Sequence, residues 1–240
     1  MKFVILSTQR SGSTWVADIL NGIEGVKVYG EQFLPEKRSW DVGEVDFPRF
    51  IEYENHGIRP VSIFRYLDEL YGQVENVGFK LMYSQIQQLP ETFLYLILKR
   101  VKVIHLVRTN YLDVLLSTKM AEARGQFHLT SSGDSLDMLQ VHLDPEYVLK
   151  RVRRQQKKVN IFRNLLKMCS SSHLEVQYES LLKNPENFQV MFTFLGFKAP
   201  EQMPRSRLSR IREGQHGDEI SNYIEVRDTL VEHGFEHLLH

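Results

Sequence analysis

The chain has 240 residues, of which 42% are hydrophobic and 25% are charged, so it can bury one sizeable core and is neither disordered nor fibrous in composition. Thirty Lys and Arg residues balance thirty Asp and Glu residues, which excludes a strong overall field for nucleic acid or a membrane surface. A single cysteine, Cys169, excludes an internal disulfide framework and a cysteine-based zinc site.

Short apolar runs alternate with helical patterns along the chain. The first run begins at Phe3 and is too short for a signal peptide or a membrane span, so we expect a cytoplasmic protein with no transmembrane segment. The alternation predicts an α/β fold, with a central, mostly parallel sheet flanked by helices, in a single domain over residues 1–240. The predicted strands cover residues 3–6, 26–29, 77–82, 101–107 and 174–178.

A polar loop with the sequence STQRSGSTW follows the first predicted strand. It indicates a turn that leads into a helix N-terminus, where unpaired amide N–H groups and the helix dipole favour a phosphate or sulfate. An ordinary Ser/Gly turn that binds nothing is the alternative. The ATP-binding P-loop has a Lys directly after its last Gly, whereas Ser13 follows Gly12 here. The loop therefore favours an anion other than a nucleoside triphosphate held with magnesium.

Polar residues lie at or just after the end of each predicted strand. Ligands of open parallel sheets bind beyond the carboxyl ends of the strands, so we expect these residues at one edge. In strand order they are Arg10 to Thr14, Glu31, Lys80, Arg108 and Tyr178.

Arg108 ends a buried strand, and the helix after it carries Ser117 nine positions later. An Arg fork and a Ser hydroxyl in this arrangement can clamp a second phosphate. The alternative is an Arg that caps the sheet edge and a Ser bonded to a helix carbonyl.

Further along the chain, Asp144-Pro145-Glu146 predicts the start of a long amphipathic helix. Residues 36–66 and 122–143 show little periodicity and are candidate substrate loops. The basic series from Lys150 to Lys158 on the helix is either a solvated face or a surface that attracts an anionic acceptor or the cofactor.

The nine histidines are scattered and none belongs to an H-E-x-x-H motif, so we predict no metal site. His105 lies inside a predicted central strand, and we expect it to be a core residue with its hydrogen bonds satisfied.

Four stretches in this order resemble the sulfotransferases that use 3′-phosphoadenosine 5′-phosphosulfate (PAPS), most closely the bacterial carbohydrate type that sulfates trehalose or Nod factors. They cover residues 8–15, 103–121, 174–197 and 220–239, and include the sequences VQYESLLKNP and SNYIEVR. The resemblance implies a three-layer, P-loop-like fold and transfer of a sulfuryl group to a hydroxyl, or alternatively an amine, of a carbohydrate, small-molecule or lipid acceptor. The product would be adenosine 3′,5′-bisphosphate (PAP).

The resemblance also assigns roles to residues that hold the nucleotide. Arg108 and Ser117 match the residues that bind the 3′-phosphate, with one more residue between them than in animal enzymes. Tyr178 matches an adenine-contacting Tyr, and Arg212 matches the Arg of a loop that closes over the 3′-phosphate, although Glu213 replaces its usual Lys. The residues that correspond to the loop around the 5′-phosphosulfate are Arg10, Ser11, Gly12, Ser13, Thr14 and Trp15, of which Trp15 also packs near the adenine.

Transfer requires a cation at the leaving oxygen and a base for the acceptor proton. Arg10 is the predicted cation, with Lys80 as a second candidate. Family members use either His or Glu as the base; Met82 occupies the region of the His, and Glu31 matches the Glu. We therefore predict Glu31 as the general base.

Two other functions are compatible with these patterns. The first is a nucleotide or small-molecule kinase of related architecture, for which the Lys after the Gly is missing. The second is a catalytically silent nucleotide-binding protein. The acceptor and the oligomeric state do not follow from the sequence.

Overall fold

The computed structural model describes residues 1–34, 47–53, 57–124, 140–169, 172–198, 200, 202–204, 206 and 215–239. Its internal contacts divide the chain into two compact units. Unit 1 comprises Met1–Val107 and Phe162–Ser206, and unit 2 comprises Arg108–Ile161 and Arg207–His240. The single domain over the whole chain stays a prediction.

Unit 1 is built on a five-stranded sheet in the order β2-β3-β1-β4-β5, and each pairing in it is parallel. This confirms the predicted α/β class and the predicted strands. The strands are β1 (Lys2–Ser7), β2 (Val26–Glu31), β3 (Asn76–Met82), β4 (Lys102–Val107) and β5 (His173–Gln177). Central strands that are covered on both faces have continuous apolar sequences, as β1 does with Phe3 to Leu6 fully buried. After β1 the chain crosses to the edge strand β2, and β4 later pairs with the other side of β1, so the order reverses at β1.

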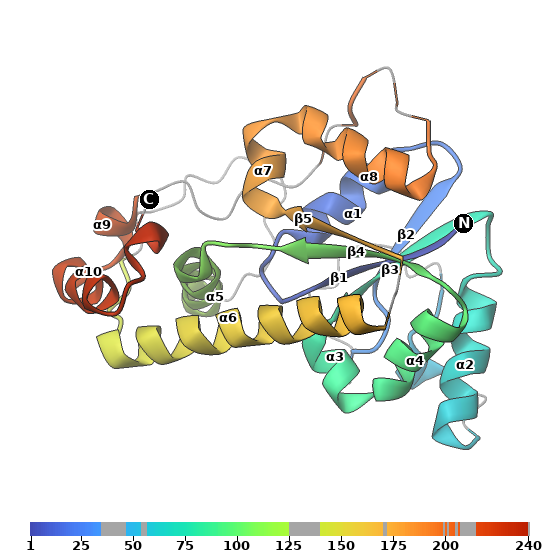
Figure 1. The fold of residues 1–240 in the computed structure, drawn as a ribbon, viewed down its shortest axis with the longest axis horizontal. Helices are drawn as coiled ribbons and strands as arrows, with labels where there is room; N and C mark the ends of the chain where they lie inside the picture. The colour runs from blue at the N-terminus through green and yellow to red at the C-terminus, as the bar shows by residue number, and fades with distance from the viewer. Residues whose placement is uncertain are drawn as a thin grey trace. The chain divides into compact units, whose positions relative to one another are not determined.

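Helices cover both faces of this sheet (Figure 1). On one side lie α1 (Ser13–Asn21), α7 (Tyr178–Lys183) and α8 (Phe188–Leu195), and on the other lie α2 (Arg59–Leu70), α3 (Tyr83–Gln88) and α4 (Pro90–Leu98). Short 3-10 helices form at η1 (Phe50–Glu52) and η2 (Pro185–Asn187).

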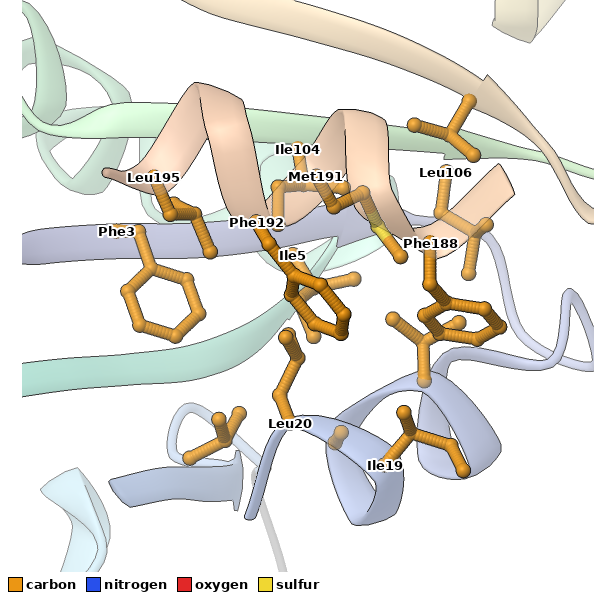
Figure 2. Close-up of a cluster of buried hydrophobic side chains, with 14 of the residues drawn as sticks. Phe3, Ile5, Ile19, Leu20, Ile104, Leu106, Phe188, Met191, Phe192 and Leu195 are labelled. Carbon is orange, nitrogen blue, oxygen red and sulfur yellow. The ribbon is translucent and has the colours of Figure 1, made fainter. Parts of the chain in front are cut away.

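The core between α1, α8 and the sheet fixes the loop after β1. Figure 2 shows Phe3 and Ile5 of β1 against Leu20 of α1 and Phe192 of α8. Since burying a side chain of this size contributes about 1.5–3 kcal/mol, the cluster holds α1 firmly on the sheet. The first turn of α1 is therefore a rigid platform at the carboxyl end of β1.

The helix α2 lies partly within residues 36–66, for which the sequence predicts an irregular substrate loop. That prediction is wrong from residue 59 onwards. The buried residues Ile63, Tyr66, Leu67 and Leu70 follow the i, i+3, i+4, i+7 spacing of one helix face. Leu67 and Leu70 lie beyond the end of the stretch, so the helical period is not visible within it. Residues 35–46 and 54–56 lie outside the described residues.

Unit 2 is helical. It contains α5 (Tyr111–Arg124), α9 (His216–Glu219), α10 (Tyr223–Glu232), η3 (Glu236–Leu238) and the first part of α6 (Pro145–Met168), which ends in unit 1. Its core joins Leu116 of α5, Val148 of α6 and Leu230 of α10. The predicted start of α6 is confirmed, because the backbone N–H of Glu146 donates to Oδ1 of Asp144 at 3.1 Å. The candidate loop 122–143 is wrong at its start, because α5 continues to Arg124, and residues 125–139 lie outside the described residues.

The predicted amphipathic pattern of α6 is also confirmed. Val152, Val159 and Phe162 are buried, whereas the basic series is mostly exposed. The exposed basic residues are Lys150, Arg151, Arg153, Arg154 and Lys157.

Candidate active site

The loop between β1 and α1 has an unusual backbone. Gly12, the N-cap of α1, has φ +84°, and Arg10 has φ +62°, which is uncommon for a residue with a side chain. The first helical hydrogen bond runs from Val16 N to Gly12 O at 3.1 Å, so the amides before Val16 form the unpaired end of the helix. Helix N-termini of this kind offer their amide N–H groups to anions.

Two serines of this loop are buried, and one of them shapes the turn. The hydroxyl of Ser11 donates to the carbonyl of Thr8 at 2.7 Å, which closes the turn across three residues. Ser13 is also buried, at the first position of α1. A hydrogen bond inside the loop therefore stabilises its conformation.

Aromatic rings pack against the loop from α7 and α8. Tyr178 begins α7, and its ring lies 5.8 Å from the ring of Trp15, edge to face. The Trp15 ring also lies 5.2 Å from the ring of Phe188. Trp15 and Tyr178 thus come together beside the loop, as expected from their positions in the sequence.

A buried lysine and a carboxylate lie next to the first turn of α1. Lys80 Nζ donates to Thr14 Oγ1 at 2.9 Å. Glu31 is the register partner of Lys80, beyond an irregularity between Tyr29 and Glu31 in the pairing of β2 with β3. Burial lowers the pKa of Lys80, and the charge of Glu31 opposes that effect. Residues from three strand ends of unit 1 therefore meet at one edge, as parallel topology requires.

Gln85 completes this cluster and is not among the predicted site residues. Its Nε2 donates to Oε2 of Glu31 at 3.0 Å, and its Oε1 accepts from the backbone N–H of Met82 at 2.9 Å. Gln85 stands three residues after the N-cap of α3, the position that Glu or Gln occupies in a capping box. The usual Ser or Thr at the N-cap is replaced by Met82, so the signature was incomplete in the sequence.

In unit 2, Arg108 is held by Asp113, which is not among the predicted site residues. Arg108 Nη2 donates to Asp113 Oδ2 at 2.9 Å, and Asp113 Oδ1 lies 2.8 Å from His216 Nε2. Ser117 is buried one turn after Asp113 on α5. Arg212 lies outside the described residues.

His105 is a satisfied core residue, as predicted. Its Nε2 is hydrogen bonded to the Tyr83 hydroxyl, and its Nδ1 lies 3.1 Å from Oε2 of Glu175. Glu175 in turn accepts two hydrogen bonds from Arg163, both at 2.8 Å. Burial lowers the pKa of His105 to about 4, so the imidazole is neutral at physiological pH.

The described residues contain neither a cluster of metal ligands nor a membrane-spanning helix. Within those residues, no group of three or more His, Cys, Asp and Glu side chains is placed to hold a metal ion. In the same part of the chain, none of the helices combines the length and the apolar character needed to span a bilayer.

Comparisons with known proteins give the family. Mouse sulfotransferase SULT7A1, solved in complex with PAP, aligns at 15% identity and a TM-score of 0.49 over 83% of this chain and 59% of its own. A sulfotransferase from Alicyclobacillus acidocaldarius aligns at 14% identity and a TM-score of 0.48 over 100% of this chain and 95% of its own. A search of curated proteins finds no significant match. The family model described as Stf0 sulphotransferase matches residues 2–224, and the chain belongs to that family.

Proposed function

We propose that the chain transfers the sulfuryl group of PAPS to a hydroxyl of a carbohydrate or another small-molecule or lipid acceptor, with Glu31 as the general base. The observation that carries this proposal is the cluster at the end of β1. It combines a helix N-terminus with a cation, Lys80, bonded to Thr14, and a carboxylate, Glu31, at the same register position.

The phosphosulfate end of the donor fits the first turn of α1. The amides at that turn and the guanidinium of Arg10 offer donors to oxygens of the 5′-phosphate and of the sulfuryl group. The left-handed backbone of Arg10 is consistent with this role, since residues with a side chain rarely adopt it and such conformations gather at ligand-binding loops.

During transfer, the acceptor oxygen forms a bond to sulfur while the bond from sulfur to the 5′-phosphate oxygen breaks. PAP leaves with the bonding electron pair, so negative charge grows on its phosphate. We assign Arg10, Lys80 and the helix amides to that charge, because fixed donors in a buried site stabilise it without reorganisation. The acceptor proton moves to the carboxylate of Glu31.

We assign the 3′-phosphate to Arg108 and Ser117 in unit 2. The bond from Arg108 to Asp113 places the guanidinium at the start of α5, and Ser117 lies on the same helix. Tyr178 and Trp15 form an aromatic pair suited to an adenine, and Arg212 remains a proposed contact to the 3′-phosphate.

The direct test is transfer from sulfur-35-labelled PAPS to a panel of trehalose, chitin oligosaccharides, a glycolipid and a simple phenol, with PAP binding measured by calorimetry in EDTA. We expect PAP to bind without metal and one class of acceptor to become labelled. Magnesium-dependent ATP hydrolysis with no PAP binding would favour the kinase alternative. PAP binding with no labelled acceptor would favour a silent nucleotide-binding protein. We also propose a cytoplasmic location and no metal requirement.

A further inference from the structure

The side chain of Gln85 is locked in one orientation beside Glu31. It is 4% exposed and makes two hydrogen bonds, one at each end of its amide. The backbone N–H of Met82 donates to Oε1 at 2.9 Å, and Nε2 donates to Oε2 of Glu31 at 3.0 Å. A flipped amide would place its NH₂ against the Met82 N–H and its oxygen against the carboxylate, so only one orientation is stable.

The choice of Gln over Glu at this position points to a role beyond capping. The capping bond to Met82 needs only an acceptor, and capping boxes use Glu or Gln for it. A Glu in place of Gln85 would make the same bond, but its second oxygen would lie about as close to Oε2 of Glu31 as Nε2 does now, at 3.0 Å. Two like charges at that separation repel each other strongly.

We infer that Gln85 is a positioning residue that holds one oxygen of Glu31, Oε2, and presents the other oxygen, Oε1, to the acceptor hydroxyl. This inference rests on the proposed role of Glu31 as the base. A carboxylate on a side chain with three rotatable bonds samples many directions unless a partner fixes it. Gln85 supplies that partner from a helix anchored at the carboxyl end of β3, 54 positions from Glu31 in sequence.

The test compares Gln85→Met with Gln85→Glu, and uses Gln87→Met as the matched control. Gln87 is on the same helix and is exposed. Gln85→Met removes both hydrogen bonds at similar size, and we expect kcat with the labelled acceptor to fall about 10- to 100-fold, as small misplacements of catalytic groups do. The affinity for PAP should change by less than about twofold, and Gln87→Met should match the wild type within the same margin.

Gln85→Glu separates positioning from folding, because it keeps the acceptor for the Met82 N–H. We expect low activity at neutral pH. At lower pH the two facing carboxyls share a proton, which restores a donor toward Glu31. The ratio of Gln85→Glu activity to wild-type activity should therefore rise as the pH falls. A purely structural defect would instead give the same reduced ratio at every pH.

A double-mutant cycle with Glu31→Gln shows whether Gln85 acts through Glu31. We expect the Gln85→Met effect on kcat to vanish in the Glu31→Gln background. An equal loss in both backgrounds, or wild-type kcat for Gln85→Met, overturns the inference. Full activity of Glu31→Gln alone would instead remove Glu31 as the base, which is a failure of the proposed function. A crystal structure of Gln85→Met with PAP gives a readout without an acceptor: Glu31 in an unchanged single rotamer contradicts the positioning role.

Discussion

Gly12 and Tyr178 share a space that leaves no room for a side chain: a Cβ on Gly12 would lie 2.2 Å from Cε2 of the Tyr178 ring. The φ of +84° at Gly12 adds a second constraint, since L-residues rarely adopt it. The N-terminus of α1 can therefore approach α7 this closely only with glycine at the cap. The loop proposed to bind the 5′-phosphosulfate depends on both conditions.

We predict that Gly12→Ala weakens PAP binding about tenfold or more and lowers the melting temperature. The left-handed backbone costs an alanine about 1–2 kcal/mol, and the ring of Tyr178 must move as well. Gly57→Ala is the control, because the atom nearest to its added Cβ would be Ser62 Oγ at 3.8 Å. Calorimetry with PAP and thermal unfolding measure the two effects. Wild-type affinity in Gly12→Ala would show that the loop does not need this geometry.

Glu31→Gln should leave PAP binding nearly intact and reduce kcat by about 100- to 10,000-fold, the usual contribution of a general base. The substitution preserves size and still offers an oxygen to the Gln85 amide, so the fold should survive. Glu24→Gln, at an exposed position before β2, is the control. Steady-state transfer of labelled sulfate at saturating PAPS measures kcat. Turnover unchanged from the wild type would take Glu31 out of the mechanism.

The sheet and one edge of the site were predictable from the sequence for a physical reason. Buried parallel strands have continuous apolar sequences, so their ends can be located, and parallel topology then brings Thr14, Lys80 and Glu31 to the same edge. These inferences need only local sequence and one topological rule.

The partners of the site residues were not predictable, because they depend on contacts between distant segments. Gln85 meets Glu31 across 54 positions, and His216 meets Asp113 across 103. Nothing in the local sequence distinguishes Gln85 from the exposed Gln87 two residues later. Sequence patterns locate elements well, whereas hydrogen-bond partners follow from how those elements pack.

Arg108→Ala should discriminate between nucleotides with and without a 3′-phosphate. We expect the affinity for PAP to fall about 10- to 100-fold, the range for losing a hydrogen bond to a charged group, and the affinity for AMP to change by about twofold or less. Arg227→Ala is the control, since Arg227 is exposed and pairs with its neighbour Asp228. Competition binding with both nucleotides gives the comparison. Equal weakening of PAP and AMP would place the 3′-phosphate elsewhere.

The buried imidazole of His105 should make the protein less stable in mild acid. Burial lowers its pKa to about 4, whereas an unfolded His titrates near 6.5. Between these values the unfolded state takes up a proton that the folded state does not, so the free energy of unfolding falls as the pH drops from about 6.5 to about 4. The full difference amounts to about 3 kcal/mol. Burial alone would raise the pKa of the Glu175 carboxyl, but hydrogen bonds from Arg163 lower it below its ordinary value of 4.5. The stability that this carboxylate contributes is therefore lost only below about pH 4.5, outside the range in which His105 acts.

Urea unfolding of the wild type and of His105→Gln at pH 7.0, 6.0 and 5.0 measures this dependence. Since Gln cannot take up a proton, the free energy of unfolding of the wild type should fall faster than that of the variant between pH 6.5 and 5. The two plots of this free energy against pH should therefore converge as the pH falls. His142→Gln, which changes an exposed histidine, should keep the wild-type slope. Parallel plots for the wild type and His105→Gln would mean that His105 has the same pKa in the folded and the unfolded protein. The hydrogen bonds of the ring with Tyr83 and Glu175 would then stabilise the imidazolium as well as they stabilise the neutral ring.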